Sequence, residues 1–138
     1  MKISDVMSKD VRLTSPDESI REAARMMAEQ DVGALPVGEN DRLVGVITDR
    51  DIAIRAIAHG RGPDAKVRDV MSPDVKYCFD DEDLSEVSQN MADIQVRRLP
   101  VLNHDKRLVG IVSLGDLAAK RALPHASRAL HGISQPSH

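Results

Sequence analysis

The sequence predicts an α/β (α+β) protein in which two copies of one βαββα unit pack together with pseudo-two-fold symmetry. Three observations predict this fold class. The chain matches itself when it is shifted by 64 residues. Each copy carries apolar residues at helical spacing, and each also carries two short runs of β-forming residues. The total of 138 residues suits one core of ordinary size, which the two copies would form jointly.

The internal repeat is the strongest signal in the sequence. Over the first 32 aligned positions, from Val6 onward, 14 residues are identical. One extra residue in a later loop of the second copy changes the offset to 65. A match of this length in the same order indicates duplication of a structural unit. The matching segments are residues 6–11 and 70–75, residues 35–37 and 99–101, and residues 43–48 and 108–113.

The repeat also sets the expected domain boundaries. We expect repeat 1 over residues 1–58, a linker over 59–65, repeat 2 over residues 66–123 and a tail over 124–138. The linker contains two Gly and one Pro, which is typical of a connection between units. The tail has no apolar period, so we expect it to be ordered only where a partner surface holds it.

Apolar spacing predicts one long helix in each copy. Four apolar residues recur in each copy at intervals of three and four residues, which places them on one helix face. We expect these residues, methionines included, to fill the core. They are Ile20, Ala23, Ala24 and Met27 in the first copy, and Leu84, Val87, Met91 and Ile94 in the second.

Two strands and a second helix are expected after each of these helices. The later strand of each copy is an unbroken apolar run, which predicts burial on both faces. Neither copy alone closes its apolar face, so we expect the copies to pack against each other. The predicted strands are residues 34–37 and 43–48 with a turn at Asn40-Asp41, and residues 98–102 and 108–113 with a turn at 103–105; the second helices begin near Asp49 and Leu114.

Composition argues against several classes of function. The net charge of -3 and the near absence of aromatic residues, one Tyr, one Phe and no Trp, disfavour nucleic-acid binding. No apolar run approaches the ~20 residues that span a bilayer, and the N-terminus lacks the apolar core of a signal peptide. Cys78 is the only cysteine, so no internal disulfide is possible. We therefore expect a cytoplasmic protein with no membrane or nucleic-acid partner.

The most informative local motif occurs once in each copy, where a predicted strand ends. Thr48 is followed three positions later by Asp51, and Ser113 by Asp116. The structural interpretation is a capping box, in which hydroxyl and carboxylate satisfy the first turn of a helix. The functional interpretation is a site where the helix N-terminus binds phosphate and the carboxylate accepts from ribose hydroxyls. The two interpretations are compatible.

Taken together, these motifs resemble tandem cystathionine-β-synthase-type (CBS) domains, known as the Bateman module. The resemblance covers residues 1–123 and rests on the order and duplication of three short motifs. It implies a stand-alone regulatory pair without an attached catalytic domain and without a required cofactor. The motifs are Asp-Val-Met-Ser at residues 5–8 and 69–72, Leu-Pro-Val at 35–37 and 99–101, and Gly-x-x-Thr/Ser-x-x-Asp at 45–51 and 110–116.

The resemblance further implies that adenosine nucleotides (AMP, ADP, ATP or NAD) bind in two clefts between the copies. In the family the Asp holds ribose, the Thr or Ser holds phosphate, and basic residues before Leu-Pro-Val contact phosphate. Only the second copy has such basic residues, so unequal clefts are expected. The first implied site contains Thr48 and Asp51 with Val96, Arg97 and Arg98, and the second contains Ser113, Asp116 and Ile111 with Val32, Gly33 and Ala34.

Asp49 departs from the family pattern near the first phosphate position. Its negative charge would weaken anion binding unless Arg50 offsets it. At about 0.3 kcal/mol per heavy atom, a mononucleotide would bind with roughly -7 kcal/mol, which is micromolar affinity. Such an affinity suits a sensor of abundant metabolites.

Other groups give weaker signals. Cys78 is expected to be buried and inert in a short strand. The acidic residues 80–83 precede a helix, so favourable charge at its N-terminus explains them more simply than a metal loop does. The histidines lack the paired spacing of a metal site, and no nucleophile–base pair emerges. The sequence therefore predicts neither a metal site nor catalytic residues; the histidines are His59, His104, His125, His131 and His138.

The sequence is compatible with three functions. The first is a nucleotide-binding regulatory module that forms a homodimer through its helices and responds to ligation. The second is an interaction module in which the Thr/Ser-x-x-Asp motifs only cap helices and an unidentified protein is the target. The third, an enzyme that turns over a bound nucleotide, ranks last, and the sequence favours a protein that is not an enzyme.

Overall fold

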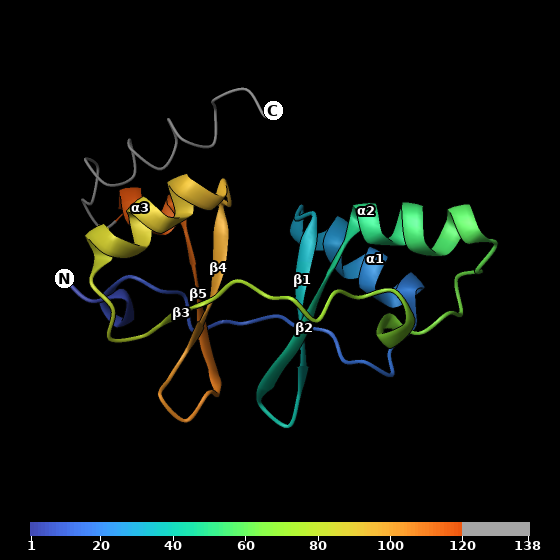
Figure 1. Cartoon of the computed structure of the whole chain (residues 1–138), viewed down its shortest axis with the longest axis horizontal. Coiled ribbons are helices and arrows are strands. Elements are labelled where there is room, and N and C mark those ends of the chain that lie inside the picture. Colours follow the sequence, from blue (N-terminus) through green and yellow to red (C-terminus); the bar gives the residue numbers. More distant parts are fainter. Residues whose placement is uncertain (120–138) are drawn as a thin grey trace. The chain divides into compact units, whose positions relative to one another are not determined.

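A computed structural model describes residues 1–119, which form two compact units (Figure 1). One unit is made of a single stretch of chain, Arg12–Val75, and is named the continuous unit. The other combines Met1–Val11 with the chain from Lys76 onward, and is named the split unit. Each unit contains helices and a small sheet, so the mixed α and β class is confirmed.

The continuous unit is a β-hairpin with helices packed on it. It contains α1 (Ile20–Gln30), β1 (Ala34–Glu39), β2 (Arg42–Thr48) and α2 (Asp49–Asp51). From α2 the chain continues as a π-helical turn (Ile52–Ala56) and two 3₁₀ turns (Ile57–His59 and Val67–Asp69). The two strands are antiparallel, with Ala34 opposite Thr48. Asn40 and Asp41 both have positive φ, 54° and 64°, as the tight turn between the strands requires.

The core of this unit lies between α1 and one face of the hairpin. Ser19 caps α1 by accepting a hydrogen bond from the backbone N–H of Glu22. Alternate strand residues point into the core, and the segment after the linker closes it. The buried residues are Ile20, Ala23, Met27, Leu35, Val37, Ile47, Ala56, Val67 and Val70.

The split unit repeats this plan around a three-stranded sheet. Its elements are a 3₁₀ turn (Ile3–Asp5), β3 (Cys78–Phe79), α3 (Leu84–Ile94), β4 (Arg98–Leu102), β5 (Leu108–Ser113) and α4 (Leu114–Ala119). Strand β3 pairs with β4 in parallel, and β4 pairs with β5 in antiparallel register. Its core contains Ile3, Val6, Cys78, Leu84, Val87, Met91, Ala92, Leu99, Val101, Val112 and Leu114.

Each Val-Met-Ser segment lies in the unit that holds the strands of the other repeat. Ser8 bridges to Ile111 in the split unit, and Ser72 bridges to Val46 in the continuous unit. The start of repeat 1 therefore packs on the strands of repeat 2, and the start of repeat 2 packs on the strands of repeat 1. A glycine makes each approach possible: a Cβ on Gly45 would lie 2.8 Å from the Ser72 carbonyl oxygen.

Most sequence-based element predictions are confirmed, and three predictions about burial are wrong. One core formed jointly by the two copies was expected, but each unit has a core of its own. Ala24 was expected in the core but is exposed, because three buried residues of α1 already cover the hairpin. Burial on both faces of the apolar strands is also wrong: along β2, Gly45 and Ile47 are buried and their neighbours only partly. Helices cover one face of each small sheet, so burial alternates along the strand.

Two further sequence-based expectations concern the tail and membrane-spanning segments. The predicted tail, residues 124–138, lies outside the described residues. Among the residues that are described, no helix is long and apolar enough to cross a membrane.

Candidate functional site

In the continuous unit, Thr48 and Asp51 form a complete capping box where β2 ends. Thr48 Oγ1 accepts from the Asp51 backbone N–H at 3.0 Å, and Asp51 Oδ2 accepts from the Thr48 N–H at 3.0 Å. This geometry confirms the capping interpretation. The other carboxylate oxygen, Oδ1, lies 3.8 Å from Arg55 Nε, and 16% of the Asp51 side chain is exposed. Asp51 therefore keeps one oxygen that is not engaged in the capping box.

The same arrangement recurs in the split unit between β5 and α4. Ser113 Oγ accepts from the Asp116 N–H at 3.1 Å, and Asp116 Oδ2 accepts from the Ser113 N–H at 3.0 Å. Ile111, two residues earlier, is half-buried in β5. The duplication thus preserves hydroxyl, carboxylate and helix start together, not only their spacing in the sequence.

Each capping box lies beside the loop that precedes the first strand of its own hairpin. In the continuous unit the Asp49 N–H donates to the Gly33 carbonyl at 2.9 Å. In the split unit the Leu114 N–H donates to the Arg97 carbonyl at 3.2 Å, and Arg98 lies opposite Ser113 in the sheet. Antiparallel pairing within each hairpin produces this neighbourhood, because the first strand begins where the second ends.

The structure therefore divides the predicted site residues between the two units. Thr48 and Asp51 lie with Val32, Gly33 and Ala34 in the continuous unit. The residues Val96, Arg97, Arg98, Ile111, Ser113 and Asp116 lie in the split unit. The implied assignment, which combines residues of different repeats, stays a prediction.

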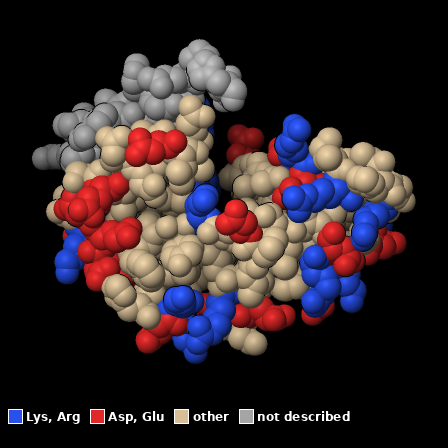
Figure 2. Space-filling view, in the orientation of Figure 1, with Lys and Arg blue, Asp and Glu red and all other residues tan. Residues whose placement is uncertain are grey.

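The charges beside the two capping boxes differ. The Asp49 carboxylate lies over Gly33, where a Cβ would be 3.2 Å from its Oδ2. Asp49 Oδ1 accepts from the Arg50 backbone N–H at 2.8 Å. In the split unit an apolar residue, Leu114, stands at the equivalent position, and exposed Arg97 and Arg98 are nearby in the chain. Figure 2 shows basic and acidic side chains mixed over the face in view.

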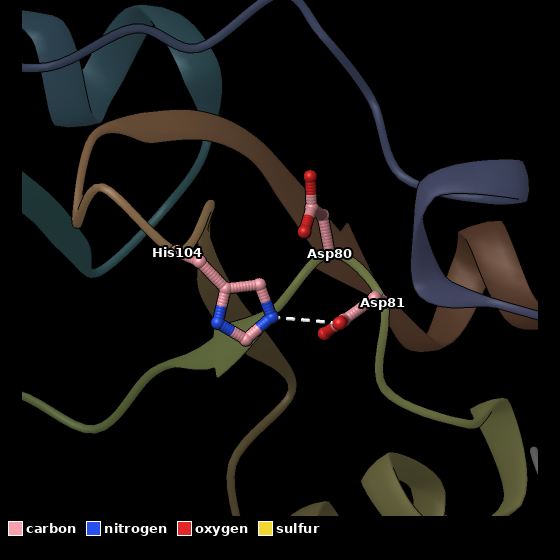
Figure 3. Close-up of side chains that lie close together, drawn as sticks. All are labelled: Asp80, Asp81 and His104. Atoms are coloured by element: carbon pink, nitrogen blue, oxygen red, sulfur yellow. Dashed lines mark hydrogen bonds and ion pairs between the residues drawn. The ribbon is translucent and has the colours of Figure 1, made fainter.

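A third group of polar side chains, which no sequence motif connects, meets in the split unit (Figure 3). The ligand-forming atoms of Asp80, Asp81 and His104 all lie within 4.8 Å of one another. His104 Nε2 is 2.6 Å from Asp81 Oδ2. This hydrogen bond raises the pKa of His104 above its usual value of 6.5 and lowers that of Asp81 below 3.8.

Parallel pairing of β3 with β4 brings these three residues together. Phe79 lies opposite Leu102, so the residues that follow both strands emerge at the same end of the sheet. No local sequence pattern connects the acidic run with His104, which lies 23 positions after Asp81. The acidic run does serve the helix, as expected, since Asp83 Oδ2 accepts from the Ser85 N–H and caps α3.

Comparison with known proteins identifies the family. The family model for the CBS domain matches residues 3–57 and 67–122 of the sequence. A CBS domain-containing protein of Bacillus subtilis, YhcV, is 43% identical over 133 residues, which cover 96% of this chain and 94% of YhcV. An inosine-5'-monophosphate dehydrogenase of Methanocaldococcus jannaschii is 38% identical over 128 residues, which cover 92% of this chain but 25% of the enzyme.

Solved structures agree with this match. Hypoxic Response Protein I, with two coordinated zinc ions, superposes with a TM-score of 0.74 at 37% identity, covering 86% of this chain and 98% of the other. CBSX2 in complex with AMP gives 0.75 at 26% identity, covering 89% and 97%. The CBS pair of MJ0100 with 5'-methylthioadenosine and S-adenosyl-L-methionine gives 0.70 at 28% identity, covering 88% and 99%. The chain belongs to the CBS-domain family and carries two CBS domains.

Proposed function

We propose that this protein is a regulatory module that binds adenosine-containing nucleotides at its two Thr/Ser-x-x-Asp motifs. One observation carries the proposal: both repeats hold a hydroxyl and a carboxylate together at the start of a helix that directly follows a strand. A helix start with a hydroxyl suits phosphate, and a carboxylate suits the two hydroxyls of ribose. Binding of AMP by CBSX2, and of two other adenosine compounds by MJ0100, supports this class of ligand.

The chemistry of each motif is compatible with its capping role. A carboxylate has about four lone-pair positions, and the capping box occupies one oxygen of Asp51. The second oxygen would accept from ribose. Each charged hydrogen bond of this kind contributes about 1.5–3 kcal/mol, or roughly 10- to 150-fold in affinity.

Isothermal titration with AMP, ADP, ATP, NAD and S-adenosylmethionine tests the proposal. At least one nucleotide is expected to bind with roughly micromolar affinity. Asp51→Ala and Asp116→Ala are each expected to remove one binding event. Ser19→Ala and Asp83→Ala are matched controls, because each removes a helix cap of the same unit outside the motif. If none of the five nucleotides binds the wild-type chain, the proposal is wrong.

Combined variants test which of the two motifs binds the nucleotide that Arg97 and Arg98 contact. The sequence prediction assigns these arginines to the nucleotide held by Thr48 and Asp51. In the Asp116→Ala background, changing both arginines to glutamine should then weaken the remaining site. If the loss appears instead in the Asp51→Ala background, the arginines serve the motif of their own unit.

We further propose that the protein forms a homodimer through the helical segment that follows β2. Ile54 and Ile57 are spaced three residues apart on this segment, and they are 49% and 60% exposed. Two large aliphatic side chains on one exposed helical face favour burial against another surface. A second copy of the chain would supply a matching apolar face by two-fold symmetry.

A ligand-independent interaction module is the second candidate. The observation in its favour is that both capping boxes are complete without any ligand. On this view Asp51→Ala and Asp116→Ala would lower stability by about 0.5–2 kcal/mol, as other cap deletions do, and would change nothing else. Stability and nucleotide binding, measured on the same variants, separate the two functions.

A further inference from the structure

We infer that Asp80, Asp81 and His104 form a binding site for a transition-metal divalent cation on the split unit. Their ligand-forming atoms already lie within 4.8 Å of one another (Figure 3). Ligands of one tetrahedral zinc ion lie roughly 3.4 Å apart, since metal–ligand bonds are about 2.0–2.2 Å. Rotation of the Asp80, Asp81 and His104 side chains would have to close that difference. The site is separate from the Thr/Ser-x-x-Asp motifs and does not depend on the proposed nucleotide binding.

The backbone fixes the positions of the three residues. Asp80 and Asp81 follow β3, and His104 follows β4, the parallel partner of β3. The Asp80 N–H donates to the Leu102 carbonyl at 2.9 Å, and the Asp80 carbonyl accepts from the Ser4 N–H at 2.9 Å. Asp80 is therefore held from both sides, so a bound ion would not have to order a flexible loop.

The imidazole is oriented before any ion arrives. Its ring stacks on Phe79, with centroids 4.9 Å apart and planes 7° from parallel. The stack aims Nε2 at the Asp81 carboxylate. On metal binding Nε2 would release its proton to solvent and donate its lone pair to the ion, while Asp81 would exchange a hydrogen bond for a metal bond.

The charges around the site favour a cation. Asp80 and Asp105 both lie close enough to His104 to stabilise positive charge there. Besides His104, the charge of Lys2 acts on Asp81, and Lys2 is exposed. The side chains of Asp81 and His104 are 51% and 66% exposed, which leaves room for water to complete the coordination shell.

The ligand set selects the class of ion. One imidazole nitrogen and two carboxylate oxygens suit zinc and neighbouring transition metals, whereas magnesium and calcium prefer oxygen ligands alone. The first repeat provides an internal comparison. Its corresponding loop, residues 38–42, has no histidine, and Asp17, which aligns with Asp81, pairs with Arg68 instead.

Zinc competition against a chromophoric chelator, with the full, tag-free chain at neutral pH, tests the site. We expect a zinc ion to bind at these residues, and His104→Gln to lower the stoichiometry by one. Asp80→Asn and Asp81→Asn should each weaken binding by at least roughly tenfold. His59→Gln and Asp64→Asn are matched controls, because both residues are exposed and lie in the continuous unit.

A second measurement reports on the residues themselves. The ring signals of His104 and Phe79 in NMR spectra should shift on addition of zinc but not of magnesium. The inference is overturned if the wild-type chain binds no zinc at 100-fold molar excess. It is equally overturned if His104→Gln keeps the wild-type stoichiometry and affinity, because the zinc then binds elsewhere, for example at the histidines beyond residue 119.

Discussion

At the scale of single residues, Cys78 illustrates how burial removes reactivity. It lies in β3 with 2% of its surface exposed, as the sequence analysis expected. Desolvation, with the nearby carboxylates of Glu82 and Asp80, raises the pKa of its thiol from 9.0 to about 12. The thiolate is the reactive form, so we expect the thiol to be inert in the folded protein.

We expect iodoacetamide to label Cys78 very slowly at pH 8 in the native state. The pKa shift alone leaves roughly a thousandfold less thiolate than an ordinary thiol would have. In 6 M urea the thiol should react at the rate of a free cysteine, as followed by mass spectrometry on a time course. Rapid native labelling would show that β3 opens readily.

The candidate-site residues also show what a short motif encodes. Thr48 and Asp51 are three positions apart, so their mutual hydrogen bonds depend only on the local start of a helix. The same holds for Ser113 and Asp116. His104 and Asp81 are 23 positions apart, and no local rule relates them. Local spacing predicted the first two pairs and could not predict the third.

At the scale of elements, the close approach of the Val-Met-Ser segments to the strands depends on glycine. A Cβ on Gly45 would lie 2.8 Å from the Ser72 carbonyl oxygen and 2.9 Å from Met71 Sδ. On Gly110 it would lie 2.9 Å from the Ser8 carbonyl oxygen and 2.6 Å from Met7 Sδ. Backbone atoms cannot move aside as side chains do, so both positions resist enlargement.

Gly45→Ala is expected to lower the free energy of unfolding by about 1–3 kcal/mol, the usual cost of overpacking. Urea denaturation followed by circular dichroism measures the change. Gly62→Ala is the control, because no atom lies within 4 Å of a Cβ there. Equal stability of Gly45→Ala and the wild type would mean that the Met71–Ser72 segment does not pack on β2 in solution.

A backbone hydrogen bond and an ion pair join two further segments of the continuous unit. The segment before α1 and the 3₁₀ turn Val67–Asp69 are linked by the backbone bond from the Val67 N–H to the Glu18 carbonyl, at 2.8 Å. Asp17 and Arg68 form an ion pair across the same contact. The hydrogen bond from Arg68, followed by its charge and that of Lys66, lowers the pKa of Asp17 below 3.8.

Because the folded-state pKa of Asp17 is lowered, its contribution to stability is present above about pH 4 and is lost as pH falls through the lowered value. In Arg68→Gln, NMR titration of the Asp17 carboxyl should give a pKa closer to 3.8. The stability difference between wild type and variant should shrink in acid. Arg21→Gln, which breaks the separate Arg21–Asp64 pair, should leave Asp17 unchanged.

At the scale of the whole molecule, the proposed homodimer can be tested by sedimentation. We expect Ile54→Asp with Ile57→Asp to yield monomers at concentrations where the wild type is dimeric, because burying two carboxylates in an apolar interface is costly. Ala24→Asp is the control, since it adds a carboxylate at another exposed helical position of the continuous unit. A monomeric wild type would contradict the proposal.

The division of the chain into two units is also a property of the whole molecule. Each unit includes the opening segment of the repeat whose strands it does not contain. Neither sequence repeat by itself therefore includes all the residues that pack in one core: Val67 and Val70 complete the core around α1, and Ile3 and Val6 complete the core around α3.

The sequence by itself determined the helices, the hairpins and the capping boxes. Apolar periodicity located α1 and α3, and the predicted limits of β4 and β5 agree with the structure. These features depend on residues close together in the chain, whose hydrogen bonds and side-chain directions follow from local geometry. The same reasoning failed for Ala24, because exposure depends on what packs against the helix.

Only the tertiary structure decided which strand each Val-Met-Ser segment contacts and what meets at the end of β3. The two segments are identical at Val, Met and Ser, and each of the two strands offers a glycine in the same place, so the sequence permits either pairing. The folded path of the chain selects the exchanged one. Parallel pairing of β3 with β4 likewise brings Asp80, Asp81 and His104 together, because register acts between residues that are distant in sequence.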